Sequence, residues 1–452
     1  MAGWAAAFLW FFVSYNWVSN SISRFGGVTF PLDMAAISLM AGIHALYPAL
    51  FSSLIPHAGR LRIWVCALVL PSAWVVLELG RSLYPAPFPW LHLGSAFWKV
   101  PVLRSLYPFA GVFGASFYIV LVNVLVWRLT GAPRGSRRGI LSSLVLLALL
   151  PAAAALFQGA QAGSVLKVGV IQGNFQQEVK WREELQEETV TTYLELTDAA
   201  VARGARLVVW PETAVPVFFQ AEPEVAQRLL DYVSARDVHL VFGSPGYEIR
   251  DDKVLLYNRV YHLSPSGDVE HYDKINLVPF GEYVPFSRLL PFVDKLVPGE
   301  GEFARGVWKG PFSTQVPSGP LVCYEVTFPW LARREVRDGS RILINVTNDA
   351  WFGRSWGPYQ HLAISAVRAA ENGVPLIRAA NTGVSALVDG RGVLAETIPL
   401  GERDVIVAQV RTGGKMTVYT RFGDWIVILA FGVITIHSLI FLFTGRSRKW
   451  TG

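Results

Sequence analysis

The stretch Arg206-Leu-Val-Val-Trp-Pro-Glu-Thr213 decides how the middle of this chain folds. Residues 206–210 carry four apolar side chains without polar alternation, which is typical of a strand buried on both faces of a sheet. Further strands are predicted at 165–172, 238–243, 255–263, 319–324, 341–347, 375–380, 384–388 and 404–410. Helices are predicted at 179–203, 222–236, 328–338 and 358–372. Strands that alternate with helices indicate a layered α/β domain.

The composition of the whole chain is too apolar for an ordinary soluble enzyme. Of its 452 residues, 52% are apolar and 16% are charged, whereas soluble domains carry about 25% charge. Stretches that approach the roughly 20 residues of a membrane-spanning helix lie at 3–20, 34–55, 62–80, 106–128, 140–158 and 425–444. We therefore expect about five membrane helices in 1–160, a soluble domain at 161–424, and a last membrane helix with a basic tail at 425–452.

The charge is divided unevenly along the chain. Residues 1–160 have a net charge of +8, residues 161–424 of −5 and residues 425–452 of +3. Nucleic-acid binding requires a basic surface on a folded domain, so the acidic middle argues against a nucleic-acid partner. Basic residues gather at 56–62, at 128–139 and in the tail. Six alternating helices place these three regions on one side, which the positive-inside rule makes cytoplasmic, and the middle domain on the other.

The loop 81–105 contains an unusually apolar segment, Pro87-Phe88-Pro89-Trp90. Such a segment is too apolar for a freely solvated turn. Two interpretations are open: the segment dips into the lipid interface, where Trp is enriched, or it packs as a cap on neighbouring helices.

Several kinds of site are not expected. The two cysteines, Cys66 and Cys323, lie in an apolar stretch and in the polar middle, and two cysteines form neither a disulfide scaffold nor a zinc site. The eight histidines show no metal-ligand spacing, and His361 is interpreted as structural. The segment Gly299-Glu-Gly301 lacks the flanking strand and helix of a phosphate-binding loop. We therefore expect neither a metal nor a cofactor.

Three reactive residues follow predicted strands, where the sites of α/β domains usually form. They are the carboxylate Glu212, the ammonium Lys274 and the thiol Cys323. A thiol is mostly protonated at neutral pH, so a carboxylate that takes its proton and an ammonium that stabilises an oxyanion would equip it for acyl transfer. The carboxylates Glu282 and Glu325 are close in sequence. Each residue also has a structural interpretation, as a core cysteine, a helix-terminal acid, a surface lysine or a salt-bridge partner.

Longer motifs surround these residues. They are Ser19 through Gly27, Phe88-Pro-Trp90, Gln172-Gly-Asn174 with Trp181, Trp210-Pro-Glu-Thr213, Lys274-Ile-Asn-Leu-Val-Pro-Phe-Gly-Glu-Tyr-Val-Pro285, Cys323-Tyr-Glu325, Thr347-Asn-Asp-Ala-Trp-Phe-Gly353 and Asn381-Thr-Gly383. With these motifs, the chain resembles the carbon–nitrogen hydrolase (nitrilase) superfamily, whose catalytic Glu, Lys and Cys follow one another in this order. Within that superfamily it resembles the apolipoprotein N-acyltransferase family over nearly its whole length. The resemblance implies a nitrilase-like αββα sandwich joined to a polytopic α-helical membrane domain.

The resemblance also implies roles for individual residues. Glu212 would be the general base, Lys274 the oxyanion stabiliser and Cys323 the nucleophile that becomes acylated. Four further residues would support the lysine or surround the pocket: Glu282, Tyr324, Glu325 and Trp181. The family usually has eight membrane helices, so six spans imply that the first two are missing from this chain.

The implied reaction is a two-step acyl transfer. An acyl chain would pass from a glycerophospholipid to Cys323 as a thioester, and then to the N-terminal α-amine of a diacylglyceryl-cysteine apolipoprotein. The products would be a mature triacylated lipoprotein and a lysophospholipid. We expect a monomer in the bacterial inner membrane, in contact with membrane lipids, with the catalytic domain on the periplasmic side.

Two features leave alternatives open. The apolar segment 286–312 is interpreted as a lid that dips toward lipid or as a loop packed over the sheet. A membrane-tethered amidase or nitrilase-type hydrolase would use the same three residues, with water as the acceptor. A transporter or receptor with an inactive external domain is a further alternative, although only Glu78 is acidic within a predicted span and transport sites usually carry ionisable residues at the midplane.

Overall fold

The computed structural model describes residues 1–452 except for five segments, 84–85, 158–162, 178–179, 286–302 and 448–452. Most of the segment 286–312, interpreted as a lid or as a packed loop, therefore lies outside the described residues. The chain forms two compact units. The first unit consists of Met1–Tyr15, Ala35–Gly159 and Arg421–Gly452, and the second of Asn16–Met34 and Ala160–Thr420.

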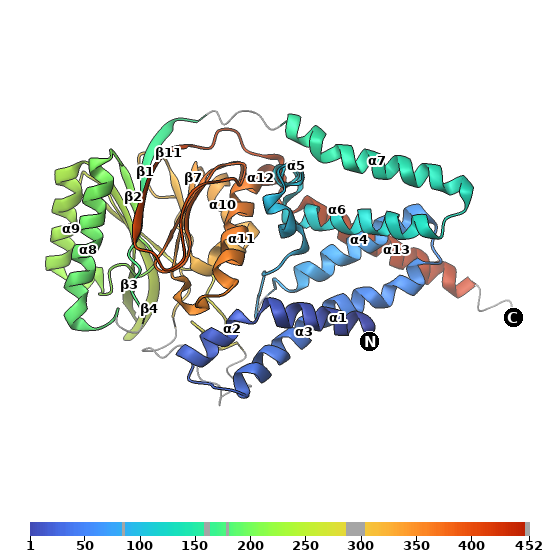
Figure 1. The fold of residues 1–452 in the computed structure, drawn as a ribbon, viewed down its shortest axis with the longest axis horizontal. Coiled ribbons are helices and arrows are strands. Elements are labelled where there is room, and N and C mark those ends of the chain that lie inside the picture. Colours follow the sequence, from blue (N-terminus) through green and yellow to red (C-terminus); the bar gives the residue numbers. More distant parts are fainter. Residues whose placement is uncertain (84–85, 158–162, 178–179, 286–302, 448–452) are drawn as a thin grey trace. The chain divides into compact units, whose positions relative to one another are not determined.

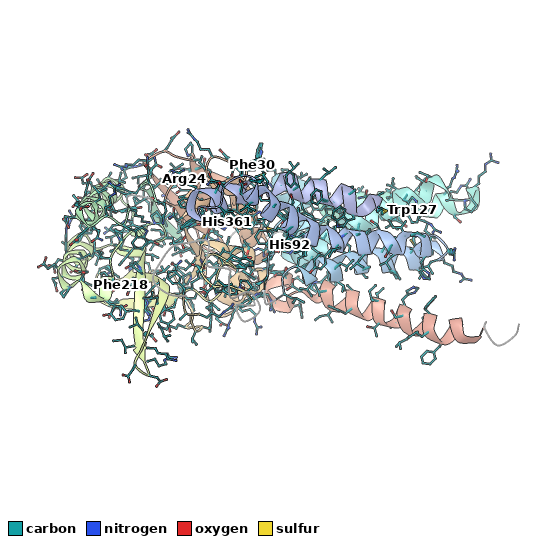
Figure 2. All side chains as sticks on the ribbon, turned by 90° about the horizontal axis from the view of Figure 1, so that it is seen from below. Arg24, Phe30, His92, Trp127, Phe218 and His361 are labelled. Atoms are coloured by element: carbon teal, nitrogen blue, oxygen red, sulfur yellow. The ribbon has the colours of Figure 1, made fainter. Side chains whose placement is uncertain are left out.

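Five of the described helices are long and apolar enough to cross a membrane. They are α3 (Leu32–Ala58), α4 (Ile63–Gly80), α6 (Tyr107–Thr130), α7 (Arg134–Leu156) and α13 (Trp425–Ser447). Each of them overlaps one predicted span. Large apolar side chains point outward along them, as Figure 2 shows for α13. Apolar side chains on all sides of a helix are typical of a membrane span.

The span predicted at 3–20 corresponds to a shorter helix. The helix α1 (Ala2–Ser14) has 13 residues, fewer than the roughly 20 that a spanning helix needs. It ends before α2 (Trp17–Asn20), which belongs to the second unit. The apolar sequence continues through Trp17 and Val18, but the helix ends at Ser14. Among the described residues, five helices are therefore long enough to span a membrane, whereas six were predicted.

The apolar segment around Trp90 packs within the first unit. The Trp90 side chain is 1% exposed, and its ring stacks on that of Phe88 with 5.8 Å between the centroids. The ring of Phe88 also meets the edge of Tyr15. Arg81 donates hydrogen bonds to the carbonyls of Trp90 and Leu91. Of the two interpretations, the structure therefore favours the packed cap.

The second unit contains two β-sheets. The first sheet contains, in spatial order, β11 (Asp404–Arg411), β1 (Val165–Gln172), β2 (Leu207–Val209), β3 (His239–Arg250), β4 (Lys253–Leu263) and β5 (Val269–Asp273). The second sheet contains β10 (Leu394–Ile398), β9 (Ser385–Val388), β8 (Leu376–Ala380), β7 (Ile342–Thr347) and β6 (Ser318–Val322). Every predicted strand coincides with one of these strands to within a few residues, apart from β3, which continues to Arg250.

Helices cover the outer faces of both sheets. Figure 1 shows α8 (Glu183–Ala202) and α9 (Pro223–Arg236) outside the first sheet, and α10 (Pro329–Arg337) and α11 (Gly357–Asn372) outside the second. The order of layers is thus helix, sheet, sheet, helix. This arrangement confirms the predicted αββα sandwich and the predicted helices.

The core between the sheets explains the continuous apolar strands. Val168 and Val209 of the first sheet share one buried cluster with Ile344 and Ile377 of the second, and all four are fully buried. Burial of each such side chain contributes about 1.5–3 kcal/mol relative to exposure. Because the other faces lie under helices, these strands have no solvent face, and polar alternation is absent from them.

Parallel pairing gathers the polar residues that follow these strands. The strand β2 pairs parallel with β1 and β3, and β7 pairs parallel with β6 and β8. The carboxyl ends of parallel neighbours lie at the same edge of a sheet. Glu212 follows β2, Cys323 follows β6 and Asn348 follows β7, so the topology brings each of them to such an edge.

Candidate active site

The candidate nucleophile, Cys323, occupies a sharp turn directly after β6. Its backbone has φ = 50°, a left-handed conformation that is uncommon for a residue with a side chain. The Cys323 carbonyl accepts hydrogen bonds from Asn345 Nδ2 at 3.2 Å and from His361 Nε2 at 3.1 Å. Strained backbone persists only where its surroundings hold it, and these two donors provide that support.

A buried ionic group holds His361 in place. Arg378 Nη2 lies 2.6 Å from Asp349 Oδ2 and 3.1 Å from His361 Nδ1. Burial lowers the pKa of His361, and the neighbouring Arg378 lowers it further. Because a carbonyl can only accept, His361 Nε2 carries a proton and donates it to the Cys323 carbonyl. Its Nδ1 lies 3.1 Å from both Arg378 Nη2 and Asp349 Oδ1. This confirms the structural interpretation of His361.

The candidate base, Glu212, is nearly buried and receives two hydrogen bonds. Asn258 Nδ2 donates to its Oε1 at 2.7 Å, and the backbone N–H of Asn348 donates to its Oε2 at 2.8 Å. Burial raises the pKa of Glu212 and the Glu282 carboxylate adds to this effect, whereas Lys274 lowers it. A carboxyl group with a raised pKa is better matched to proton transfer near neutral pH than an ordinary one.

Lys274 lies between two carboxylates. Its Nζ is 2.9 Å from Glu282 Oε1 and 3.9 Å from Glu212 Oε1, and the side chain is buried. Burial alone would lower the pKa of Lys274, but the two carboxylates outweigh burial, and the pKa is raised. Lys274 is therefore a permanent cation, as the stabilisation of an oxyanion requires.

The three residues interact in one buried site. Burial raises the pKa of the Cys323 thiol, and the charge of Glu212 raises it further, while Lys274 and a hydrogen bond with Thr347 lower it. The net direction is upward, so the resting sulfur is a neutral thiol. A thiol of this kind becomes nucleophilic only when a base takes its proton during attack, and Glu212 is the carboxylate whose charge acts most strongly on it.

Two of the supporting residues organise this site. Glu282 accepts hydrogen bonds from Lys274 and Asn258 and also from the backbone N–H of Val278 at 2.8 Å. Glu325 is completely buried and accepts from four groups: the backbone N–H groups of Ile275, Asn276 and Val322, and the hydroxyl of Tyr272. Glu325 thus joins the turn at Cys323 to the segment after Lys274.

The electrostatics of Glu325 follow from its burial. Burial raises the pKa of Glu325 to about 7, although the backbone donors and the charge of Lys274 act in the opposite direction. The ring of Tyr324, also buried, meets the edge of Phe328. Trp181 is 48% exposed. The structure therefore places Glu282 and Glu325 within the site, whereas Trp181 presents its ring to the surface of the second unit.

Three polar contacts of the site escaped prediction. Asn258 bridges the two carboxylates Glu212 and Glu282, and Asn348 supplies its backbone N–H to Glu212. Lys180 is buried, and its Nζ donates to the Glu212 carbonyl at 3.1 Å; burial lowers the pKa of Lys180 to about 7. Asn348 belongs to a quoted motif and Lys180 precedes Trp181, but Asn258 lies within an ordinary strand pattern.

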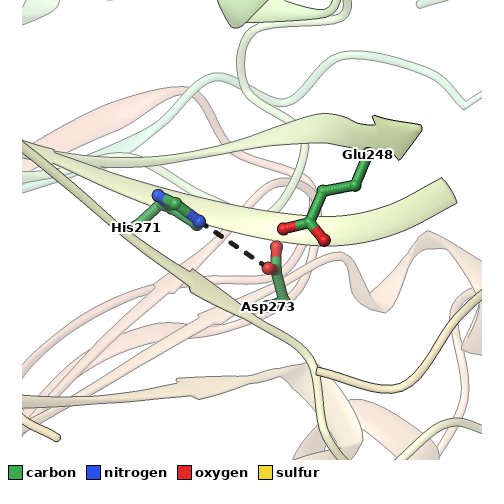
Figure 3. A group of neighbouring side chains, drawn as sticks. All are labelled: Glu248, His271 and Asp273. Atoms are coloured by element: carbon green, nitrogen blue, oxygen red, sulfur yellow. Dashed lines mark ion pairs between the residues drawn. The ribbon is translucent and has the colours of Figure 1, made fainter. Parts of the chain in front are cut away.

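A second cluster of polar side chains lies on the first sheet. Glu248, His271 and Asp273 offer ligand atoms within 4.8 Å of one another (Figure 3). Arg259 already provides a positive charge here, since its Nε lies 2.5 Å from Asp273 Oδ1 and its Nη2 lies 3.6 Å from Glu248 Oε1. An arginine that pairs with both carboxylates accounts for the cluster without a metal ion.

Two family models and several relatives match most of this chain. The family model described as "Carbon-nitrogen hydrolase" matches residues 167–414, and that described as "Apolipoprotein N-acyltransferase N-terminal domain" matches residues 1–125. The chain is 39% identical to "Apolipoprotein N-acyltransferase" of Geobacter metallireducens over 90% of this chain and 80% of the relative. It is 34% identical to the protein of that name from Methylococcus capsulatus, over 94% and 84%. A solved carbon–nitrogen hydrolase from Helicobacter pylori is 18% identical and covers 55% of this chain and 89% of its own, with a TM-score of 0.42.

Proposed function

Because the chain belongs to the apolipoprotein N-acyltransferase family, we propose that it transfers an acyl chain from a glycerophospholipid to the N-terminal α-amine of a diacylglyceryl-cysteine apolipoprotein. One observation carries this proposal: Glu212, Lys274 and Cys323 interact within one buried site. A base, a fixed cation and a thiol are the groups that covalent acyl transfer requires.

In the first half-reaction, Cys323 becomes acylated. The sulfur attacks the ester carbonyl of the phospholipid while Glu212 takes the thiol proton. Lys274 stabilises the oxyanion of the tetrahedral intermediate. The bond between the carbonyl carbon and the glycerol oxygen then breaks, and Glu212 returns the proton to that oxygen. The products of this step are a thioester on Cys323 and a lysophospholipid.

In the second half-reaction, the acyl chain passes to the apolipoprotein. The neutral α-amine attacks the thioester carbonyl, and Glu212 takes one of its protons. The carbon–sulfur bond breaks, the sulfur recovers a proton from Glu212, and an amide remains on the lipoprotein. An amide is more stable than the ester from which the chain came, so the transfer needs no further source of energy.

The proposed substrates suit a protein held in a bilayer. The chain is a multi-pass membrane protein, and five helices among its described residues are long and apolar enough to span a bilayer. We place it in the bacterial inner membrane with its α/β unit on the periplasmic side, because its basic loops then face the cytoplasm. Both lipid substrates would reach such an enzyme by lateral diffusion. We also propose that the enzyme acts as a monomer.

The test is the intact mass of the protein after exposure to phospholipid vesicles alone. We expect an adduct of one acyl chain, removed by neutral hydroxylamine as a thioester is. Addition of a diacylglyceryl-cysteine peptide should release the adduct and yield the N-acylated peptide. The Cys323→Ala variant should form no adduct.

Three outcomes would contradict the proposal. They are the absence of an adduct on the wild-type protein, an adduct that persists in Cys323→Ala, and normal transfer by Cys323→Ser. Hydrolysis of soluble amides without lipid, in place of transfer, would identify the amidase alternative instead.

A further inference from the structure

A segment from near the N-terminus is built into the second unit. Residues 16–34 belong to this unit, although the rest of its chain begins only at residue 160. Within the segment, α2 (Trp17–Asn20) continues into one turn of wider π-helix, Ser21–Phe25. In the sequence, the segment lies between the apolar helices α1 and α3. A simple linker between α1 and α3 would not need to belong to the α/β unit, so specific contacts must hold the segment there.

The segment binds the short helix that follows Asn348. Asn20 Nδ2 donates a hydrogen bond to the Trp351 carbonyl at 3.0 Å, and Ser21 Oγ donates to the same oxygen at 2.7 Å. The ring of Phe25 meets the edge of the Trp351 ring, with 4.4 Å between the centroids. Two donors on one carbonyl and an aromatic contact on the same residue hold Trp351 from one side.

A second pair of contacts extends this attachment along the chain. The ring of Trp17 lies against that of Phe352, with 4.5 Å between the centroids, and its Nε1 donates to Gln360 Oε1 at 3.0 Å. The fit is close, because a side chain added at Gly353 would come within 2.7 Å of Asn20 Cγ. The segment and residues 351–360 are therefore packed together without free space at this point.

The N-terminal end of the same short helix contacts the reacting groups. The backbone N–H of Asn348 donates to Glu212 Oε2 at 2.8 Å. The next residue, Asp349, lies 3.1 Å from His361 Nδ1, and His361 donates to the Cys323 carbonyl. The turn Asp349–Phe352 thus connects the contacts with residues 17–25, which lie at its end, to the contacts with the base and with His361, which lie at its start.

From these contacts we infer that Asn20 and Ser21 are positioning residues for the general base, which they hold in place through Trp351 and the backbone N–H of Asn348. This inference rests on the proposed function. A backbone N–H stabilises a carboxylate only while the chain that carries it is held at hydrogen-bond distance. Of the two hydrogen bonds that Glu212 receives from Asn258 and Asn348, the one from Asn348 belongs to the chain that this segment holds.

The expected effect of losing the attachment follows from the surroundings of Glu212. The charged and titratable groups that act on it are Lys274, Glu282, Lys180 and, across the site, the Cys323 thiol. None of these groups belongs to segment 16–34 or to residues 348–352. The one charged residue of that turn, Asp349, is paired with Arg378 and acts on the Cys323 thiol. A looser Asn348 N–H removes stabilisation from the ionised base, and the pKa of Glu212 rises.

The experiment measures the rate of thioester formation on Cys323 against pH in vesicles. Ser21→Ala combined with Asn20→Leu removes both donors to Trp351 without adding a charge. We expect the acylation rate at neutral pH to fall about tenfold, comparable to the loss of one hydrogen bond to a charged group. The acidic limb of the profile should move to higher pH. The single variant Ser21→Thr keeps a hydroxyl donor and should retain the wild-type profile.

A matched control lies in the same turn. Ser23 Oγ donates to the Ser19 carbonyl within the segment, so Ser23→Ala removes a hydroxyl without touching Trp351. It should keep the wild-type rate and acidic limb, and thermal unfolding of each variant reports whether the unit stays folded. The inference is overturned if the double variant keeps the wild-type acidic limb, or if Ser23→Ala moves it equally. Absence of a thioester on the wild-type protein would instead refute the proposed function.

Discussion

At the scale of single residues, the site depends on how one lysine is shared. Lys274 contacts Glu282 at 2.9 Å and Glu212 at 3.9 Å, so the closer carboxylate neutralises the lysine and the more distant one remains available as a base. Asn258 donates to both carboxylates. This donor reduces the repulsion between two like charges that would otherwise drive one of them to take up a proton.

Replacing Glu282 tests this division of roles. The charge of Glu282 raises the pKa of Glu212, so Glu282→Gln should lower that pKa, and the base should stay ionised to lower pH. We expect the acidic limb of the acylation profile to move to lower pH, opposite to the shift expected for the Asn20 and Ser21 variant. The rate at neutral pH should fall about tenfold or more, because Lys274 loses its nearest partner.

The control for this variant is Glu224→Gln, which removes an exposed carboxylate from the first turn of α9. It should change neither the rate nor the pH profile. An acidic limb of Glu282→Gln that stays in place or moves to higher pH would show that Glu282 does not act on Glu212 as described.

At the scale of elements, the base is placed by the close approach of two chain segments. The segment after β2 crosses β3 at Gly243, whose N–H donates to the Pro211 carbonyl and whose carbonyl accepts from Val215. A side-chain carbon added at Gly243 would lie 2.3 Å from the Thr213 nitrogen and 2.7 Å from Glu212 Cα. Only glycine leaves room for the backbone of the base to pass at this distance.

Gly243→Ala should therefore displace Glu212 without unfolding the sheet. We expect a stability loss of about 1–3 kcal/mol, typical of an overpacked site. The acylation rate should fall about 100-fold, because a displacement near 1 Å has an effect of this size on a reacting group. Thermal unfolding and the rate of thioester formation are the two measurements.

The comparison variant is Gly135→Ala, where an added carbon meets nothing within 4 Å. It should leave the acylation rate unchanged. Acylation by Gly243→Ala at the wild-type rate would mean that the base reaches its position without the close approach to β3.

At the scale of the whole molecule, charge and hydropathy are distributed to suit a membrane. Residues 161–424 carry the acidic excess, whereas the basic excess lies in the two ends that hold the long apolar helices. Basic loops remain on the cytoplasmic side during insertion. The distribution therefore predicts an orientation for each loop that labelling can detect.

Cysteine labelling tests this orientation. Both native cysteines are buried, so an introduced cysteine at an exposed position dominates the reaction with a maleimide. In intact cells, a membrane-impermeant maleimide should label Asp252→Cys, at the turn between β3 and β4, because that turn would face the periplasm. Ser136→Cys, beside the arginines that begin α7, should be labelled only after permeabilisation. The reverse pattern would contradict the proposed orientation.

How far the fold could be predicted differs between elements for physical reasons. The strands of the shared core and the long helices were predictable because burial on both faces, or in lipid, leaves an apolar run in the sequence. The strands β5 and β10 were missed because both lie at sheet edges and carry polar or exposed side chains, as in Val269–Asp273 and Leu394–Ile398. The 13-residue helix α1 was predicted too long, because composition does not show where a helix ends.

The sequence by itself determined the class of the two units and the types and order of Glu212, Lys274 and Cys323, because burial and residue chemistry are recorded locally. Only the tertiary structure decided that Asn258 bridges two carboxylates and that residues 16–34 belong to the α/β unit. Such contacts join segments far apart in the chain. They depend on which strands become neighbours and on the packing of side chains, and no local pattern records either.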